Sequence, residues 1–281
     1  MNTDIFNFKR FGNYLGTEIR NAVSQFGYSG LVCALGSLVV YIFVGFGSLA
    51  SLHGWSSAGL APRFASFILI MVSVLILAPK KIYGGITDKK AGSVFLSIPV
   101  STLEKVLAMV IVSCIIVPLA VLIAYLSIDG ILCLIDRNCG SSLIVASFSG
   151  LENMLAKIGE LPEELAGIQS LMNPLIYIDD IIQIGLVFLL GSIFFKSSKV
   201  AKTILSLMVF GFACSMIMTP IFFHGTIFNV NIQNDAEAIE FINNVFGGFF
   251  NHAGLIDTIS DTLTNLLLLT GIYFRVRTLK F

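Results

Sequence analysis

Long apolar stretches alternate with short charged segments along this chain. A hydrocarbon core about 30 Å thick requires roughly 20 mostly apolar residues per helix, so each stretch free of Asp, Glu, Lys and Arg is a candidate span. The pattern predicts an all-α, polytopic membrane protein with six transmembrane helices. They are expected at Ser29 to Ala50, Phe64 to Pro79, Val106 to Ile128, Leu175 to Lys196, Thr203 to Phe223 and Leu255 to Phe274. The fourth carries Asp179 and Asp180 at one end, and the last carries Asp257 and Asp261 in its first turns.

The first 28 residues show a different pattern, with apolar side chains recurring every three or four positions, as on one face of a helix. We predict that residues 1–28 form a cytoplasmic amphipathic helix in the headgroup plane, retained rather than cleaved, ahead of a single transmembrane domain at 29–281. An ordinary helix packed on its neighbours is the alternative. The apolar positions are Phe8, Phe11, Leu15, Ile19, Ala22 and Phe26, and the polar ones are Lys9, Arg10, Asn13, Glu18, Arg20 and Gln25.

Composition strengthens the membrane assignment, because 56% of residues are hydrophobic, 12% are charged and the mean hydropathy is +0.90. The 17 basic and 17 acidic residues cancel, which argues against a nucleic-acid partner. With the N-terminus inside, only Arg63, Arg137 and Lys157 of the basic residues fall in outer segments. The positive-inside rule therefore predicts that both termini are cytoplasmic.

Motifs for catalysis are missing from the sequence. There is no phosphate-binding loop of the Walker type, no H-E-x-x-H and no G-x-S-x-G. We therefore expect no enzymatic activity and no cofactor in this chain. His53, His224 and His252 have no local spacing typical of metal ligands, so no metal site is expected either.

Cys133 and Cys139 flank two charged residues on the predicted outer side. An oxidising compartment could join them in a disulfide. Cys133 could instead remain embedded in the membrane as a small apolar residue, and the sequence leaves both interpretations open.

Three polar residues spaced four apart form one stripe on the last predicted span: Asp257, Asp261 and Asn265. Ionisable groups at membrane depth are costly and often functional, so the stripe is a candidate wall of a substrate path or outer gate. The alternative is that the two aspartates reach the outer headgroups.

The segment 80–105 is the longest predicted inner loop and has internal structure. Gly84 and Gly85 interrupt the chain, Ile86 to Phe95 fits a short surface helix, and Pro99 ends it. Ser101-Thr-Leu-Glu104 then fits a capping box, in which the serine and glutamate side chains bond each other's backbone amides. We expect a folded connection that fixes the second span to the third, at Val106 to Ile128.

The run FLSIPVSTLEK, with the opening FNFKRFGNYLGTEIRN, resembles the six-span permease subunits of bacterial type-2 ABC exporters. The resemblance covers the pattern of roughly the first 130 residues, whereas the outer loop at 129–174 and the second half carry no matching motif. It implies an interfacial helix at Phe8 to Phe26 and a coupling helix around Ile86 to Phe95 that docks into a separate ATPase. The signature positions are Ile98 (leucine in the family branch), Pro99, Ser101, Glu104 and Lys105.

By this resemblance the chain is an export permease in the bacterial cytoplasmic membrane, in contact with lipids, an ABC ATPase subunit and a second permease copy or paralogue. Asp88, Lys89 and Lys90 are expected to contact the ATPase at its periphery, and Val94 and Phe95 to insert into its groove. For the lysines, a solvated cluster that obeys the positive-inside rule is an equal alternative.

Two other functions fit the same composition. A secondary transporter or channel would show paired broken spans and polar residues near the midplane. A non-transporting immunity or sensory subunit is the other. The sequence carries no signature of the cargo, of the transport direction or of which ATPase binds. It also does not show whether the permease forms a homodimer or a heterodimer.

Overall fold

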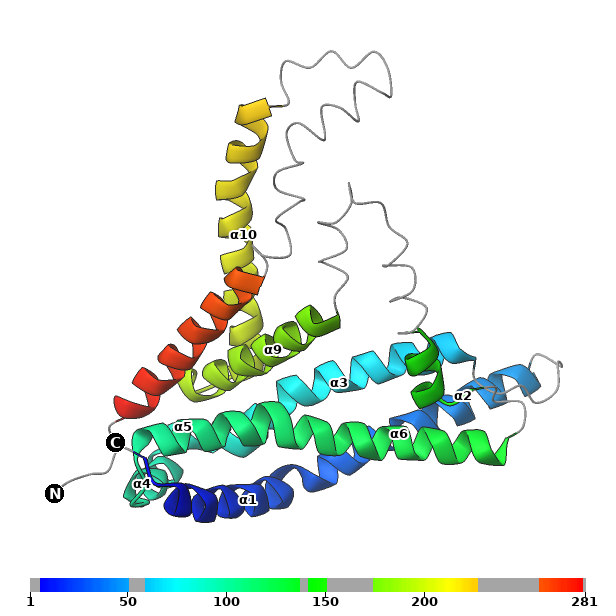
Figure 1. The fold of residues 1–281 in the computed structure, drawn as a ribbon, viewed down its shortest axis with the longest axis horizontal. Coiled ribbons are helices and arrows are strands. Elements are labelled where there is room, and N and C mark those ends of the chain that lie inside the picture. The colour runs from blue at the N-terminus through cyan, green and yellow to red at the C-terminus, as the bar shows by residue number, and fades with distance from the viewer. Residues whose placement is uncertain (1–5, 51–58, 137–140, 151–173, 227–257, 280–281) are drawn as a thin grey trace.

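The computed structural model describes residues 6–50, 59–136, 141–150, 174–226 and 258–279, and all regular structure in these ranges is helical (Figure 1). The all-α prediction is therefore confirmed for this part of the chain. Two helical stretches are given by number alone, 143–150 and 258–277. The named elements are α1 (Phe8–Ala34), α2 (Gly36–Ala50), α3 (Leu60–Tyr83), the 3₁₀ helix η1 (Gly84–Thr87), α4 (Lys89–Ser97), α5 (Thr102–Val110), the π-helix η2 (Ile111–Ile116), α6 (Val117–Ile135), α9 (Pro174–Phe194) and α10 (Lys199–Thr226).

Four helical runs in the described ranges are long and apolar enough to cross a membrane. Two other predicted spans coincide with α9 and with the described part of the last helix, but neither is among these four. The count of six spans thus stays a prediction. The four runs are Phe8–Gly47, Leu60–Thr87, Thr102–Ile135 and Lys199–Met216.

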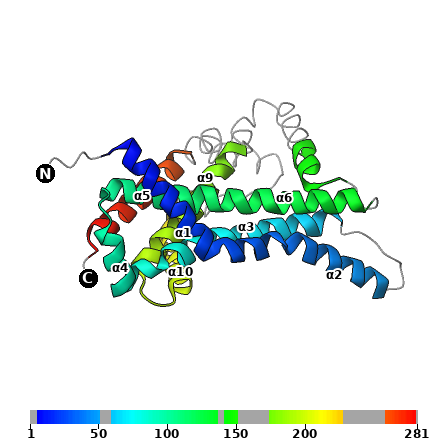
Figure 2. The same cartoon turned by 90° about the horizontal axis from the view of Figure 1, so that it is seen from below.

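Helices α1, α3 and α5–η2–α6 run side by side along the long axis of the molecule (Figures 1 and 2). The start of α1, helix α4 and the end of helix 258–277 lie at one end, which we name the α4 end. The end of α6, the start of α3 and helix 143–150 lie at the opposite end.

Helix α1 continues past residue 28, where the predicted interfacial helix was to give way to the first span. It packs on α3, α5 and α6, so its inward face is set by these neighbours, and Glu18 is buried although the pattern placed it on the polar face. Phe8, expected on the apolar face, is 83% exposed. A location in the headgroup plane stays a prediction. The buried face of α1 repeats every four residues and consists of Tyr14, Glu18, Ala22, Phe26, Gly30 and Ala34.

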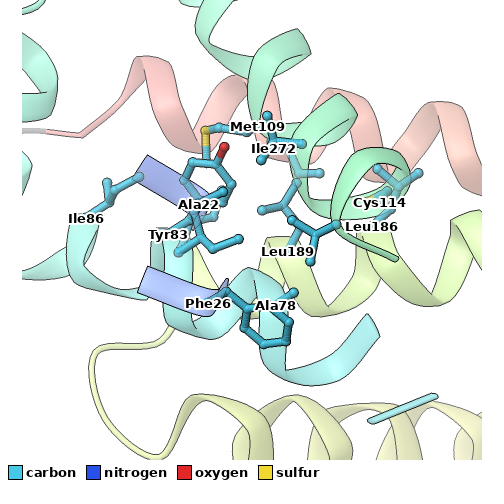
Figure 3. Close-up of a cluster of buried hydrophobic side chains, with 14 of the residues drawn as sticks. Ala22, Phe26, Ala78, Tyr83, Ile86, Met109, Cys114, Leu186, Leu189 and Ile272 are labelled. Carbon is cyan, nitrogen blue, oxygen red and sulfur yellow. The ribbon is translucent and has the colours of Figure 1, made fainter. Parts of the chain in front are cut away.

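The main core lies where α1, α3, η2, α9 and the last helix meet (Figure 3). Helix α9 approaches η2 closely because Gly185 has no side chain: a Cβ there would lie 2.9 Å from Cys114 Sγ. The π-helix ends two residues before Pro118, which lacks the amide hydrogen that a regular helix would use. The wider turn accommodates this missing bond.

Helix α10 leaves the bundle, as Figure 1 shows in yellow. Ser198 turns the chain between α9 and α10 with a left-handed backbone (φ 49°), and Gly191 allows the two helices to touch at Thr203. Beyond Thr203, the described side chains of α10 are exposed on every face, including Phe210 and Phe212. An apolar helix exposed all round is typical of a helix that contacts lipid or another membrane chain.

Candidate functional site

Helix α4 is short and amphipathic, and it begins three residues later than the predicted surface helix because Gly84–Thr87 forms a 3₁₀ turn first. Asp88, Lys89, Lys90 and Val94 are exposed, with Val94 at 62%. Phe95 is 7% exposed and belongs to the core. Its predicted insertion into a partner's groove is therefore corrected: its ring packs inside the protein, whereas Val94 and Leu96 are exposed apolar residues of α4.

The predicted capping box at the start of α5 is confirmed. Ser101 Oγ accepts the backbone N–H of Glu104 at 3.3 Å, and Glu104 Oε2 accepts the backbone N–H of Ser101 at 3.1 Å. Two amides that would otherwise lack partners at the helix start are thereby satisfied.

Glu104 also holds the start of α1, a role that the sequence pattern did not suggest. Its carboxylate accepts Nε and Nη2 of Arg10, each at 2.8 Å, and the backbone N–H of Asn7 at 2.7 Å. Asn7 in turn caps α1 through its side-chain oxygen, which accepts the N–H of Lys9 at 3.0 Å. A carboxylate with no exposed surface thus joins the first residues of two helices.

Lys105 fixes the C-terminal end of α4. Its ammonium donates to the carbonyl oxygen of Phe95 at 2.8 Å and lies 5.0 Å from the centre of the Phe95 ring. The last carbonyls of a helix lack partners within the helix, and its C-terminal end carries partial negative charge, so a cation there stabilises it. The adjacent residues Glu104 and Lys105 therefore connect α1, α4 and α5.

Two basic residues from the second half bind helix ends in the same way. Lys199, the first residue of α10, donates to the Gly84 carbonyl and, at 2.7 Å, to Thr87 Oγ1. Arg275 donates to the Ile193 carbonyl at the end of α9 at 3.1 Å. These two basic residues thus also brace the α4 end.

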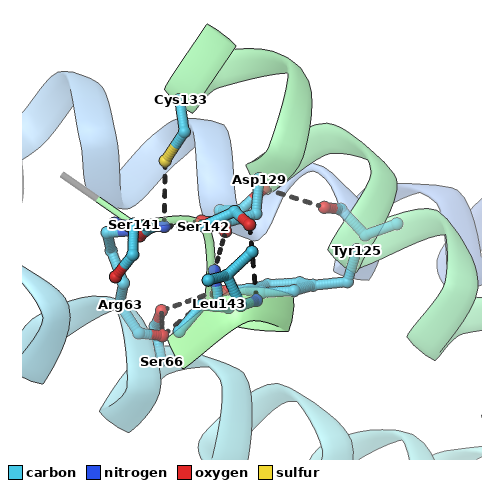
Figure 4. A network of polar contacts seen from close by, with 11 residues as sticks. Arg63, Ser66, Tyr125, Asp129, Cys133, Ser141, Ser142 and Leu143 are labelled. Atoms are coloured by element: carbon cyan, nitrogen blue, oxygen red, sulfur yellow. Dashed lines mark hydrogen bonds and ion pairs between the residues drawn. The ribbon is translucent and has the colours of Figure 1, made fainter. Parts of the chain in front are cut away.

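A second polar cluster lies at the opposite end (Figure 4). Arg63 from α3 and Asp129 from α6 form two hydrogen bonds, of 2.9 Å from Nε and 2.7 Å from Nη2. Both side chains are 3% exposed. Asp129 also accepts the backbone N–H of Leu143 at 2.9 Å, and Arg63 donates to the Ser141 carbonyl at 3.3 Å, so the pair anchors helix 143–150 as well.

Arg63 and Asp129 were predicted to lie in outer loops. The structure corrects this, because both lie within helices and are buried. Tyr125, one turn before Asp129, extends the cluster through a 2.8 Å bond to Ser66. Each charged residue lies close to the end of an apolar run, which is why the sequence pattern made it the boundary of a predicted span. Their pairing depends on how α3 and α6 pack against each other.

Cys133 is disulfide-bonded, and its sulfur lies 3.1 Å from Arg63 Nη2. The predicted partner, Cys139, lies outside the described residues. The bridge belongs to the same end of the bundle as the Arg63 cluster. The free cysteines in the described ranges are Cys33, Cys114 and Cys214.

The predicted stripe on the last helix is described only in part, because Asp257 lies outside the described residues. Asp261 and Asn265 are both partly buried, on the side that continues to the core residue Ile272. Asn265 Oδ1 is buried and has no hydrogen-bond partner in the described ranges. The role of these residues in a substrate path stays a prediction.

No group of three or more His, Cys, Asp or Glu side chains in the described part of the chain is placed to hold a metal ion. The side chains of His53, His224 and His252 are outside that part. Comparison with known proteins gives no match, either to a family model, to a curated protein or to a solved structure.

Proposed function

We propose that this protein is the permease subunit of an ATP-driven exporter, with six transmembrane helices, an N-terminal helix at the cytoplasmic boundary and a separate soluble ATPase bound to α4. The observation that carries the proposal is the bracing of α4. A helix that receives force from a partner must be exposed on one face and rigidly joined to the membrane helices on the other. Helix α4 exposes Lys89, Lys90 and Val94 and is fixed through Phe95 and Lys105.

The spacing of the two polar clusters supports an orientation across a membrane. Glu104 and Asp129 lie 25 residues apart (129 − 104) on the continuous helix α5–η2–α6, which corresponds to about 37 Å at 1.5 Å per residue. This exceeds a hydrocarbon core of about 30 Å. We therefore assign each ion pair to the neighbourhood of one boundary, with α4 on the cytoplasmic side and helix 143–150 on the outer side.

The bracing also suggests how movement is transmitted. Force on α4 passes through Lys105 and Glu104 to α5 and α1, and through Gly84 and Thr87 to Lys199 in α10. The helices would then move as rigid bodies between two states when the ATPase closes. A second copy of the chain, or a paralogue, completes the transport path, and the exposed apolar surface of α10 is available to face it or the lipid.

The test is to purify the tagged protein from its own membranes in mild detergent and to identify co-purifying proteins by mass spectrometry. An ATPase with a Walker motif should accompany the wild type and be lost with Lys89→Glu/Val94→Asp. Arg277→Glu, an exposed charge change at the same end but off α4, is the matched control and should retain the ATPase. Absence of an ATPase from the wild type, or its retention by the double variant, would overturn the proposal.

A further inference from the structure

A cavity of about 540 Å³ opens beside α4, between α1, the end of α3 and η1. Glu18 and Tyr83 form its buried polar part, and Asp88 and Lys90 belong to its rim. Much of the remaining wall is apolar and includes Ile86 and Val94. None of the contacts that brace α4 uses the Glu18 carboxylate.

Glu18 is buried without a salt bridge to a cation among the described residues. The residue is 7% exposed, and its Oε2 forms no hydrogen bond of regular geometry in these ranges. The hydroxyl groups of Tyr83, 2% exposed, and of Tyr14, 5% exposed, lie beside this carboxylate and interact with it. Glu104, by contrast, has no exposed surface and accepts bonds from Arg10, Asn7 and Ser101.

A buried carboxylate without a counter-charge is costly, and the cost falls when a cation with N–H donors enters. The cavity wall carries the carboxyl groups of Glu18 and Asp88 and the ammonium of Lys90, and Lys199 lies close enough to Asp88 to interact with it, so Glu18 is the carboxyl group that lacks a cation. The phenol oxygen of Tyr83, which lines the cavity, can accept a further N–H bond beside the carboxylate. The apolar wall suits an aliphatic arm rather than a hydrated ion.

We propose that this cavity is a binding site for an organic cation, with an ammonium or guanidinium group bonded to Glu18 and its aliphatic arm against Ile86 and Val94. Such a group could come from a free amine in the cytosol or from the ethanolamine headgroup of a lipid at the boundary. The site does not depend on an ATPase partner. Occupancy would, however, cover Lys90 and Val94, which also belong to the exposed face of α4.

The first test uses the full chain in detergent with n-butylguanidinium and its neutral analogue n-butylurea. Cation binding should raise the thermal unfolding midpoint saturably, since a ligand that binds only the folded state stabilises it. n-Butylurea should leave the midpoint unchanged, and the cation effect should vanish in Glu18→Gln. Equal shifts in the wild type and the variant, or no saturable shift, would overturn the proposal.

A second measurement needs no variant. A hydrophobic carbodiimide modifies accessible buried carboxyl groups, and mass spectrometry can quantify its attachment at Glu18. At a cation concentration about ten times Kd, attachment at Glu18 should fall about tenfold, in proportion to the unoccupied fraction. Unchanged attachment would overturn the site even if Glu18→Gln did not fold.

Nanodiscs distinguish the two sources of the cation. If the headgroup is the ligand, Glu18 should be protected from carbodiimide in discs that contain phosphatidylethanolamine and reactive in discs of phosphatidylcholine alone. If a free amine is the ligand, Glu18 should react in both discs and be protected in both by n-butylguanidinium. Reaction in both discs without protection by the cation would rule out the site.

Discussion

The two ion pairs at the ends of α5–η2–α6 use the same chemistry in different surroundings. Both join an arginine fork to one carboxylate, with Arg10 and Glu104 at the α4 end and Arg63 and Asp129 at the opposite end. Arg63 is 3% exposed, whereas Arg10 is 36% exposed. Water therefore reaches one arginine and is excluded from the other. We therefore expect the Arg63–Asp129 pair to cost more free energy to break than the Arg10–Glu104 pair at the α4 end.

The largest effect is expected from Asp129→Ala. It removes the carboxylate that pairs with the buried Arg63 guanidinium and the acceptor for the Leu143 amide, so the free energy of unfolding should fall by about 3–5 kcal/mol. Denaturant unfolding in detergent would measure the change. The double variant Arg63→Met/Asp129→Leu should recover much of the loss, because both charges of the pair are removed together. An equal loss of unfolding free energy in the single and the double variant would contradict this account of the Arg63–Asp129 pair.

Glu104→Ala should cost less, about 2–3 kcal/mol, because water can solvate the released Arg10 while the charged hydrogen bonds are lost. Hydrogen exchange at the first turn of α1 should accelerate with little change near Asp129. Glu104→Gln, which retains the acceptor oxygen and the shape, is the matched control and should be milder. A cost as large as that of Asp129→Ala would mean that the two ends do not differ.

Lys105→Met removes the cation from the last carbonyls of α4 but keeps the length of the side chain. A cation at a helix C-terminus contributes up to about 1 kcal/mol in ordinary settings, so overall stability should change by about that amount. Amide exchange in Lys89–Ser97 should rise selectively. Lys202→Met, an exposed lysine of α10 at the same end, should leave that exchange unchanged.

Lys89→Glu should have the smallest effect on stability, within about 0.5 kcal/mol, because the side chain is exposed and forms none of the bracing contacts of α4. Its effect should appear in partner binding, measured by the amount of co-purified ATPase per permease. A clear loss of stability without a change in binding would show that α4 is structural rather than a docking surface.

Local chemistry was the part of this molecule that the sequence predicted best. The capping box at Ser101 and Glu104 depends on residues three apart, and the apolar runs of α3 and α5–α6 depend on composition alone. Both can be inferred without knowing what packs on what. The short helix after Gly84 could also be predicted from local sequence, although it begins at Lys89 because a 3₁₀ turn precedes it.

Contacts between distant segments were the part that could not be predicted. Arg63 and Asp129 are 66 residues apart, and Arg10 and Glu104 are 94 apart, so their pairing depends on which helices become neighbours. Burial of Glu18 and Phe95 has the same origin: their inward direction is set by α3 and α5, not by the pattern of their own helices. An unaligned sequence carries no direct signal of such neighbours.

The π-helix at Ile111–Ile116 sets the rotational phase between the two clusters. In an unbroken α-helix, 25 residues at 100° each would return Asp129 to within about 20° of the direction of Glu104, so both would face one neighbour. The additional residue in a π turn rotates everything beyond it by about 100°. One continuous rod can thus point a carboxylate at α1 at one end and another at α3 at the other. The six residues of η2 thus set a fixed angular offset, so a rotation of this helix about its axis would move Glu104 and Asp129 in directions about a quarter turn apart.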